Sequence, residues 1–385
     1  MKPANTLFAG MGVSVFEEMS KLAMAESSIN LGQGFPDGNG PDDVRAAAAA
    51  ALEDQPNQYP PMMGVPELRQ AVARHGQRFY GLDVDWEAEV MVTTGATEGL
   101  VAALLGLLNP GDEVVLFEPL YDSYVPILRR GGAVPRYVRL EPPDFALDQD
   151  RLEAAFSERT KLVLLNNPHN PAAKVFSRAE LERIAALIER YDTYAVCDEV
   201  YEHIVYDGHE HVPLITLPGM RERCVKIGSA GKTFSLTGWK VGYMTAAPAL
   251  LAPIAKTHQF LVFTTAPNLQ RATAFGLDKD DAYFTGLAEE MRASRDRLSA
   301  GLERIGFALA PCAGTYFINA NFRPLGFSGG DVEFCAHITR EAKVTALPVS
   351  AFYADDEIDS LIRFCFSKKN EVLDEALARL ERHFA

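Results

Sequence analysis

The sequence predicts an α/β fold, a mostly parallel sheet sandwiched between helices, with a smaller α+β domain attached. Between about Val90 and Met244, short apolar runs rich in β-branched residues alternate with helical patterns. The runs are apolar throughout, which is typical of strands that crossover helices bury on both faces. After about Asp280 the pattern changes to a long charged helix followed by shorter strands and helices.

The elements of the first region follow one another in a regular order. Continuous apolar character predicts strands at 90–94, 114–119, 134–140, 161–168 and 194–200. Helical patterns between them predict helices at 95–108, 124–130, near Leu152 and at 177–191. Ligands of such sheets bind beyond the carboxyl ends of the strands, so we expect the functional residues there.

The second region predicts a separate arrangement. Its elements are a charged helix at 289–306 and strands at 315–322, 344–349 and 361–367. We predict a large domain at residues 40–280 and a small domain made of residues 1–39 and 281–385. The N-terminal segment would then join the C-terminal part in space.

Composition limits the function classes. The 385 residues are 48% hydrophobic, enough for a large core, and the net charge of -15 argues against a nucleic-acid partner. Five scattered cysteines predict reduced core thiols rather than disulfides or a zinc site. Neither an apolar run of roughly 20 residues nor a signal-like N-terminus is visible, so we expect a cytoplasmic protein without a membrane partner.

Lys232 lies in a loop of small residues, GSAGKTFSLTGWKVG, between Ser229 and Lys240. Pyridoxal 5′-phosphate needs one lysine that condenses with its aldehyde, and hydroxyl and cationic groups that bind its phosphate. The sequence therefore predicts this cofactor on Lys232, with Ser229 and Lys240 at the phosphate. The alternative is a solvated lysine beside a turn.

Asp198 ends the strand YAVCDEV, where a buried carboxylate needs a cation. The protonated pyridine nitrogen of the cofactor is such a cation, and an arginine partner or a helix cap is the alternative. Tyr201 and Asn170 could donate hydrogen bonds to the ring's phenolic oxygen. Alternatively, Tyr201 is a core aromatic and NNPHNP is a turn.

The residues Gly95, Ala96 and Thr97 open a helix directly after a strand, which exposes backbone N–H groups to an anion. With Ser229 and Lys240 they predict a phosphate site, although Thr94 and Thr97 could simply cap the helix. Tyr121, in EPLYDSY, is placed to stack on the cofactor ring or to pack in the core.

Arg363 lies in the apolar run LIRFCF. A guanidinium in such a setting favours a carboxylate in fork geometry, and the α-carboxylate of a substrate would satisfy it. The alternative is an arginine on an edge strand that pairs with a surface acid.

Together these residues resemble the class I, fold-type I aminotransferases. The segments that carry the resemblance are INLGQGFPDGNGP, NQYPPMMGVPELR, NNPHNP, CDEVYEHIVY, SAGKTFSLTGWKVGY and PVSAFY. They are most similar to the methionine aminotransferase and kynurenine–glutamine transaminase branch.

The resemblance implies a homodimer with shared active sites, in which Tyr59 reaches the partner's phosphate. It implies that Gly34 offers backbone to the substrate carboxylate. It also implies that the substrate pocket is shaped by Phe16, Tyr124, His258 and Phe352. Lys240 stands where many relatives have arginine, and Phe16 where some have tryptophan, which leaves the preference for aromatic substrates open.

We therefore predict a ping-pong transamination in which Lys232 holds the cofactor and moves the proton of the substrate α-carbon. No second cation for a dicarboxylate is apparent, so the expected amino donors are sulfur-containing, glutamine-like or aromatic. A cysteine-conjugate C–S β-lyase is the alternative. A ligand sensor without enzymatic activity would need a basic DNA-binding module, which is not apparent.

Overall fold

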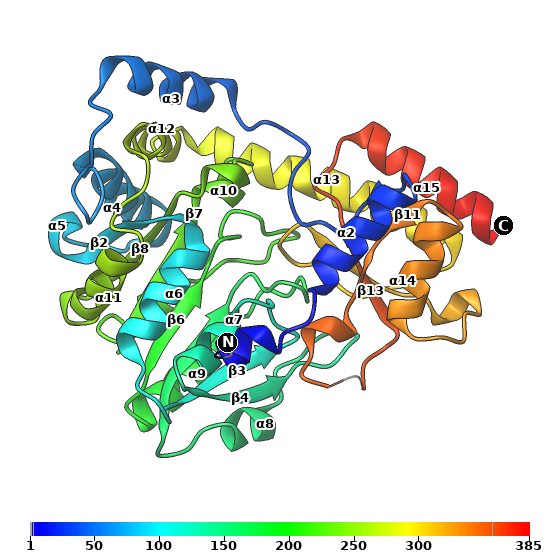
Figure 1. Cartoon of the computed structure of the whole chain (residues 1–385), viewed down its shortest axis with the longest axis horizontal. Coiled ribbons are helices and arrows are strands. Elements are labelled where there is room, and N and C mark those ends of the chain that lie inside the picture. The colour runs from blue at the N-terminus through cyan, green and yellow to red at the C-terminus, as the bar shows by residue number, and fades with distance from the viewer. Residues whose placement is uncertain (1, 3, 356) are drawn as a thin grey trace.

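In the computed structural model, which describes residues 2, 4–355 and 357–385, a seven-stranded sheet forms the centre of the larger part (Figure 1). The strand order is β2-β8-β7-β6-β5-β3-β4, and every neighbouring pair is parallel except those of β8. The predicted α/β class is confirmed. The strands are β2 (Val90–Thr93), β3 (Glu113–Glu118), β4 (Val134–Arg139), β5 (Thr160–Asn166), β6 (Tyr194–Asp198), β7 (Cys224–Ser229) and β8 (Gly242–Ala246).

Helices cover both faces of this sheet. On one face, α6 (Gly95–Leu107) packs across β6, β7 and β8. It also packs against α11 (Pro248–Leu261). On the other, α9 (Arg178–Arg190) buries Leu181, Ile184 and Ile188 completely. The helix α9 begins at a capping box of Ser177 and Glu180, and its buried side chains recur with helical spacing.

The remaining helices of this part include two that the sequence predicts, at 124–130 and near Leu152, together with others that it does not. Most surround the sheet, and three of them pack together beside β2. They are α3 (Asp42–Asp54), α4 (Pro66–Tyr80), α5 (Trp86–Glu89), α7 (Tyr124–Arg130), α8 (Gln149–Ala154), α10 (Ala230–Thr233) and α12 (Pro267–Leu277). The predicted helix at 124–130 is confirmed, with the bounds of α7.

The N-terminal and C-terminal segments pack together in the smaller part. The strand β1 (Ile29–Asn30) pairs in parallel with β11 (Val344–Thr345). The blue helix α2 (Val15–Ala25) lies beside the orange helix α14 (Asp331–Arg340) (Figure 1). Met19 and Leu31 share one core cluster with Phe334 and Phe364. This arrangement agrees with the expectation that the N-terminal segment packs with the C-terminal part. The domain boundaries at 39/40 and 280/281 stay a prediction.

A four-stranded antiparallel sheet, β12-β13-β10-β9, organises the C-terminal part. The helix α13, 25 residues long, runs from the larger part into it (Figure 1). The elements are α1 (Thr6–Ala9), α2 (Val15–Ala25), β1 (Ile29–Asn30), α13 (Asp281–Ile305), β9 (Ala308–Leu309), β10 (Phe317–Asn321), α14 (Asp331–Arg340), β11 (Val344–Thr345), β12 (Leu347–Pro348), β13 (Leu361–Cys365) and α15 (Asn370–Phe384).

Two further findings concern the whole described chain. None of its helices combines the length and the apolar character that crossing a membrane requires. All five cysteines are free thiols, and four of them are buried, as the scattered spacing predicts.

Candidate active site

The carboxyl ends of three parallel strands meet at one cavity of about 480 Å³. Asn166 ends β5, Asp198 ends β6 and Ser229 ends β7, and all three line it. The register explains their proximity, because Asn166 is paired with Asp198 across the two central strands. The cavity therefore lies where the parallel sheet predicts it.

Most of the residues singled out in the sequence surround this cavity. Its lining includes Phe16, Gly34, Ala96, Thr97, Tyr121, Tyr124, Asn170, Asp198, Tyr201, Ser229, Lys232, Lys240 and Arg363. These residues come from the N-terminal segment, the large sheet and the C-terminal part. The fold thus brings together side chains that are more than 300 positions apart in the chain.

Three residues implied by the resemblance lie outside the lining. Tyr59 is 85% exposed and its ring packs against Phe263. Phe352 is buried behind the cavity, edge-on to Phe16 with 5.6 Å between the ring centroids. His258 lies on α11 and does not reach the cavity, because its Nδ1 is 3.0 Å from the Glu98 carboxylate.

Through Glu98, His258 has a structural role instead of a place in the substrate pocket. The other oxygen of this carboxylate accepts the backbone N–H of Thr94 at 3.0 Å. The pair therefore supports the first turn of α6 from behind.

Asp198 presents one satisfied and one unsatisfied oxygen. Its Oδ2 accepts a hydrogen bond from the Tyr124 hydroxyl at 2.6 Å, while its buried Oδ1 has no partner among the described residues. Burial raises the pKa of this carboxyl, and the Tyr124 hydrogen bond opposes the rise. A cationic N–H donor placed at Oδ1 would satisfy the free oxygen and keep the group ionised.

Lys232 is held at the middle of the cavity by α10. Its Nζ donates to the Tyr316 hydroxyl at 2.7 Å and lies 3.5 Å from the Gly34 carbonyl oxygen. Burial lowers the pKa of this amine to about 8. About a tenth of the amine is therefore neutral at pH 7, far more than for an ordinary lysine, and the neutral form is the one that acts as nucleophile or proton acceptor.

Arg363 is 1% exposed and lies on β13, which has a neighbour on each side. Its Nη1 donates to Asn170 Oδ1 at 2.7 Å and its Nη2 to the Gly32 carbonyl at 3.2 Å, both neutral oxygens. Its buried Nε has no partner among the described residues, and burial lowers the pKa of the group to about 10. The alternative of an edge-strand arginine paired with a surface acid is therefore wrong, because β13 is an inner strand.

The first turn of α6 lies against Lys240 at the opposite end of the cavity. Gly95 has a φ of 74°, and a Cβ built on it would lie 3.3 Å from Lys240 Nζ. A Cβ on Gly242 would come within 2.6 Å of the Gly95 carbonyl carbon. Close approach therefore requires both glycines. Thr94 makes no side-chain cap, so the helix-cap alternative is wrong for that residue.

Sequence reasoning did not find Tyr316 or Phe317, and it placed Asn166 at the end of a strand without giving it a role. Asn166 Nδ2 donates to the Asp198 carbonyl at 2.8 Å, and the Phe317 ring centroid lies 3.9 Å from the Arg363 guanidinium carbon. Tyr316 and Phe317 belong to the segment TYFINANF, which reads as an ordinary buried strand. Only the contacts of the folded chain, of Tyr316 with Lys232 and of Phe317 with Arg363, show that they face the site.

A family model described as aminotransferase class I and II matches residues 26–380. The chain belongs to the class I and II aminotransferases. The enzyme is 44% identical over 378 residues to the probable N-succinyldiaminopimelate aminotransferase of Mycobacterium tuberculosis, covering 95% of each chain. It is 40% identical over 372 residues to the methionine aminotransferase of Escherichia coli, covering 97% of this chain and 96% of the relative.

Solved structures agree with these matches. The N-succinyldiaminopimelate aminotransferase of M. tuberculosis superposes with a TM-score of 0.96 at 43% identity over 100% of both chains. The E. coli protein identified as having a methionine aminotransferase function gives 0.96 at 39% identity, covering 99% of this chain and 100% of the other. The enzyme therefore depends on pyridoxal phosphate, the cofactor of this family.

The cavity fits that cofactor in three places. The free Oδ1 of Asp198 suits the N–H of a protonated pyridine ring. Lys232 supplies a partly neutral amine for the aldehyde. The N-terminus of α6, with Ser229 and Lys240 nearby, supplies donors and charge for a phosphate.

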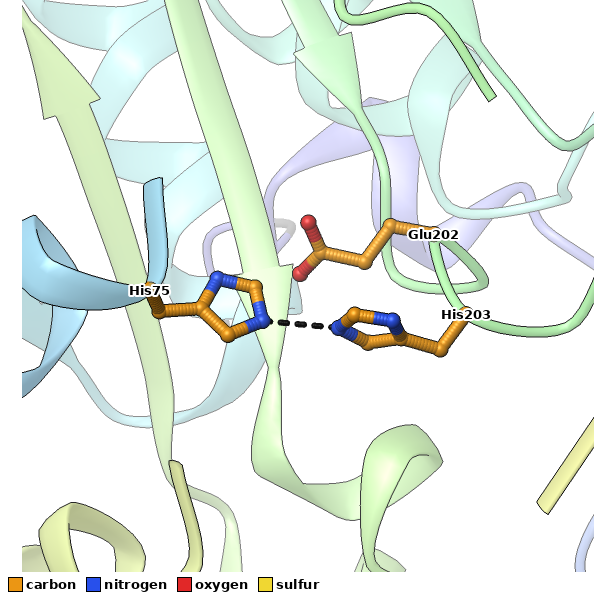
Figure 2. Close-up of side chains that lie close together, drawn as sticks. All are labelled: His75, Glu202 and His203. Atoms are coloured by element: carbon orange, nitrogen blue, oxygen red, sulfur yellow. Dashed lines mark hydrogen bonds between the residues drawn. The ribbon is translucent and has the colours of Figure 1, made fainter. Parts of the chain in front are cut away.

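A second polar cluster lies beside the loop that follows β6. Figure 2 shows His75, from α4, and His203 pointing toward one another next to Glu202, and their Nε2 atoms are 2.7 Å apart. Glu202 Oε2 accepts from Lys226 Nζ at 2.6 Å and from the Tyr80 hydroxyl at 2.8 Å. We call these five residues the closed cluster. The ammonium of Lys226 already neutralises Glu202, and the imidazoles bond each other, so the arrangement is a hydrogen-bonded ion cluster.

Proposed function

We propose that the aminotransferase transfers the α-amino group of a neutral amino acid to a 2-oxo acid by a ping-pong reaction. The observation that carries this proposal is the charge of the cavity wall. Among the described residues, its only lysine and arginine side chains are Lys232, Lys240 and Arg363. Asp122 adds a carboxylate besides Asp198.

Each of the three cations has a separate task in this proposal. Lys232 holds the cofactor, Lys240 faces its phosphate, and Arg363 binds the substrate α-carboxylate with the backbone of Gly34 beside it. No cation is left for a second carboxylate on the substrate side chain. Burying such a charge without a partner is costly, so uncharged side chains are favoured.

The cofactor supplies an electron sink for the charge that develops at the substrate α-carbon. The protein's own residues do the rest. Lys232 would accept the α-proton on Nζ once its amine is free and pass it on within the same half-reaction, and the second half-reaction would run this transfer in reverse. Asp198 keeps the ring nitrogen protonated through its free Oδ1. Tyr201 and Asn170 donate to the ring's phenolic oxygen.

The names of the relatives include different substrates. The relatives therefore support the type of reaction, transamination, and do not select one amino donor. Methionine appears in the name of the E. coli relative, and N-succinyldiaminopimelate in that of the M. tuberculosis relative. We favour methionine, glutamine or aromatic donors because the wall near Arg363 includes Phe16 and Phe317.

We also propose that the enzyme works as a homodimer. Tyr59 is 85% exposed and Phe260 84% exposed, while Val262 and Phe263 lie beside them on the surface. Exposed aromatic side chains of this kind mark surfaces that bind another protein. In this proposal Tyr59 reaches the phosphate in the partner subunit.

We further propose that the enzyme works in the cytoplasm, because its free thiols are typical of proteins in a reducing compartment.

A panel of amino acids tests the substrate proposal. Purified cofactor-loaded enzyme is mixed with each amino acid alone, and conversion of the cofactor to its amine form is followed by absorbance. We expect methionine, glutamine and phenylalanine to react at least about a hundredfold more efficiently than aspartate, the penalty of one unpaired buried charge. A preference for aspartate over methionine would contradict the proposal.

A further inference from the structure

Tyr316 joins three separate parts of the chain through one hydroxyl group. The residue directly precedes β10, is 1% exposed, and its ring stands at 90° to the Tyr201 ring with 5.2 Å between centroids. Its hydroxyl contacts Lys232 of α10 and Gly34, which follows β1. The packing thus fixes the hydroxyl between the N-terminal segment and the lysine.

The direction of these hydrogen bonds follows from elementary chemistry. The Tyr316 hydroxyl lies 2.8 Å from the Gly34 carbonyl oxygen, which can only accept, so the single hydroxyl proton points to Gly34. The oxygen lone pair then faces Lys232 Nζ at 2.7 Å and accepts from it. Burial holds the pKa of Tyr316 well above its ordinary value, so the hydroxyl stays protonated and does not act as a base.

The backbone of Gly34 packs tightly against the same segment of the chain. A Cβ built on it would lie 2.7 Å from the Phe317 ring, so its backbone lies directly against the residue that follows Tyr316. The Tyr316 hydroxyl therefore holds two groups at once: the amine of Lys232 and the backbone of Gly34.

We propose that Tyr316 is a positioning residue that orients the free Lys232 amine, with a lone pair directed at the substrate α-carbon, and holds it in register with Gly34. This inference rests on the proposed role of Lys232. Without the hydroxyl, the amine keeps its chemistry but samples several rotamers, and fewer of them place Nζ for proton transfer.

The test compares Tyr316→Phe with Tyr206→Phe. The Tyr206 hydroxyl is buried and donates to the Thr315 carbonyl at 2.5 Å, so that variant also loses one buried hydroxyl close by, without touching Lys232. In the cofactor-loaded enzyme we expect Tyr316→Phe to lower kcat about tenfold or more, with little change in KM, and Tyr206→Phe to leave both within about twofold.

A second readout is independent of turnover. In the full-length cofactor-free chain, acylation of Lys232 by an amine-reactive ester is followed against pH by peptide mass spectrometry. The parent should show a midpoint near pH 8. An acceptor stabilises the ammonium form, so Tyr316→Phe should lower the midpoint by about one pH unit, whereas Tyr206→Phe should not.

The possible outcomes are distinguishable. An unchanged kcat and an unchanged midpoint in Tyr316→Phe would overturn the inference, as would losses no larger than those of Tyr206→Phe. Turnover that survives in Lys232→Ala would instead overturn the proposed role of Lys232. Thermal unfolding of both tyrosine variants establishes that each is folded at the assay temperature.

Discussion

The cavity and the closed cluster both contain buried charges within a few residues of the end of β6, yet they differ in how those charges are satisfied. In the closed cluster, Glu202 accepts from Lys226 and Tyr80, and the two histidines bond each other. In the cavity, Asp198 Oδ1 and Arg363 Nε have no partner among the described residues. Buried groups with free bonding capacity mark the place where a ligand completes the structure.

The two sites also differ in the direction of their pKa shifts. Burial raises the pKa of Asp198, whereas in Glu202 the Lys226 charge and the nearby histidines outweigh burial and lower it. Removing the cation from a buried carboxylate that is paired destabilises the fold. A buried carboxylate without a cation destabilises the free protein, and a cationic ligand that pairs with it relieves this cost on binding. We therefore expect substitutions in the cavity to cost activity and substitutions in the closed cluster to cost stability.

The largest effect is expected for Asp198→Asn. The amide no longer carries the charge that keeps the ring nitrogen protonated, so kcat/KM should fall roughly 10³-fold or more. The free energy of unfolding of the cofactor-free chain should stay the same or rise, because an unpaired buried carboxylate is removed. Steady-state kinetics and urea denaturation measure the two effects. A large loss of stability with little loss of activity would refute the contrast between the two sites.

Lys226→Met should show the opposite pattern. It leaves Glu202 and Glu199 buried without their cation, and Lys226 Nζ lies 2.6 Å and 3.6 Å from these carboxylates. We expect the free energy of unfolding to fall by about 3–5 kcal/mol. The matched control is Lys256→Met on the exposed side of α11, which should change it by less than about 0.5 kcal/mol. Equal stability of the two variants would contradict the account.

The smallest expected effect is a pH dependence of stability carried by His75. Burial lowers the pKa of this imidazole to about 4, against about 6.5 in the unfolded chain. Below pH 6.5 the unfolded chain binds a proton that the folded chain does not. Stability should therefore fall with pH from 6.5 toward 4, by up to about 1.4 kcal/mol per pH unit from this group.

His75→Gln isolates that contribution. Urea denaturation at pH 7, 6 and 5 should give a shallower slope of the free energy of unfolding against pH for the variant than for the parent, whatever its absolute stability. Identical slopes would show that His75 is not held neutral by burial.

Five strands of the large sheet, β2 to β6, could be predicted from the sequence because they are largely apolar runs, and the residues at their carboxyl ends followed from that. Asn166 and Asp198 end neighbouring strands, and the parallel topology alone places them together. Lys232 was recognisable because small residues surround it. These features are local in the chain, which is why sequence patterns contain them.

Tyr316 and the closed cluster could not be predicted in the same way. Tyr316, directly before β10, meets Lys232 of α10 across 84 positions of the chain. His75 and His203 are 128 positions apart and meet through the packing of α4. The resemblance placed His258 in the pocket, but the side chain is bound to Glu98 on the far side of the first turn of α6. Such contacts depend on tertiary packing, which periodicity does not encode.

The central claim is that Lys232 is the residue that holds pyridoxal phosphate. Borohydride reduction of the cofactor-loaded enzyme, followed by proteolysis and mass spectrometry, fixes the cofactor to the lysine that carries it. The account predicts the reduced adduct on the peptide that contains Lys232, and its loss in Lys232→Ala. An adduct on Lys240 or on another lysine, or none at all in coloured, active protein, would contradict it.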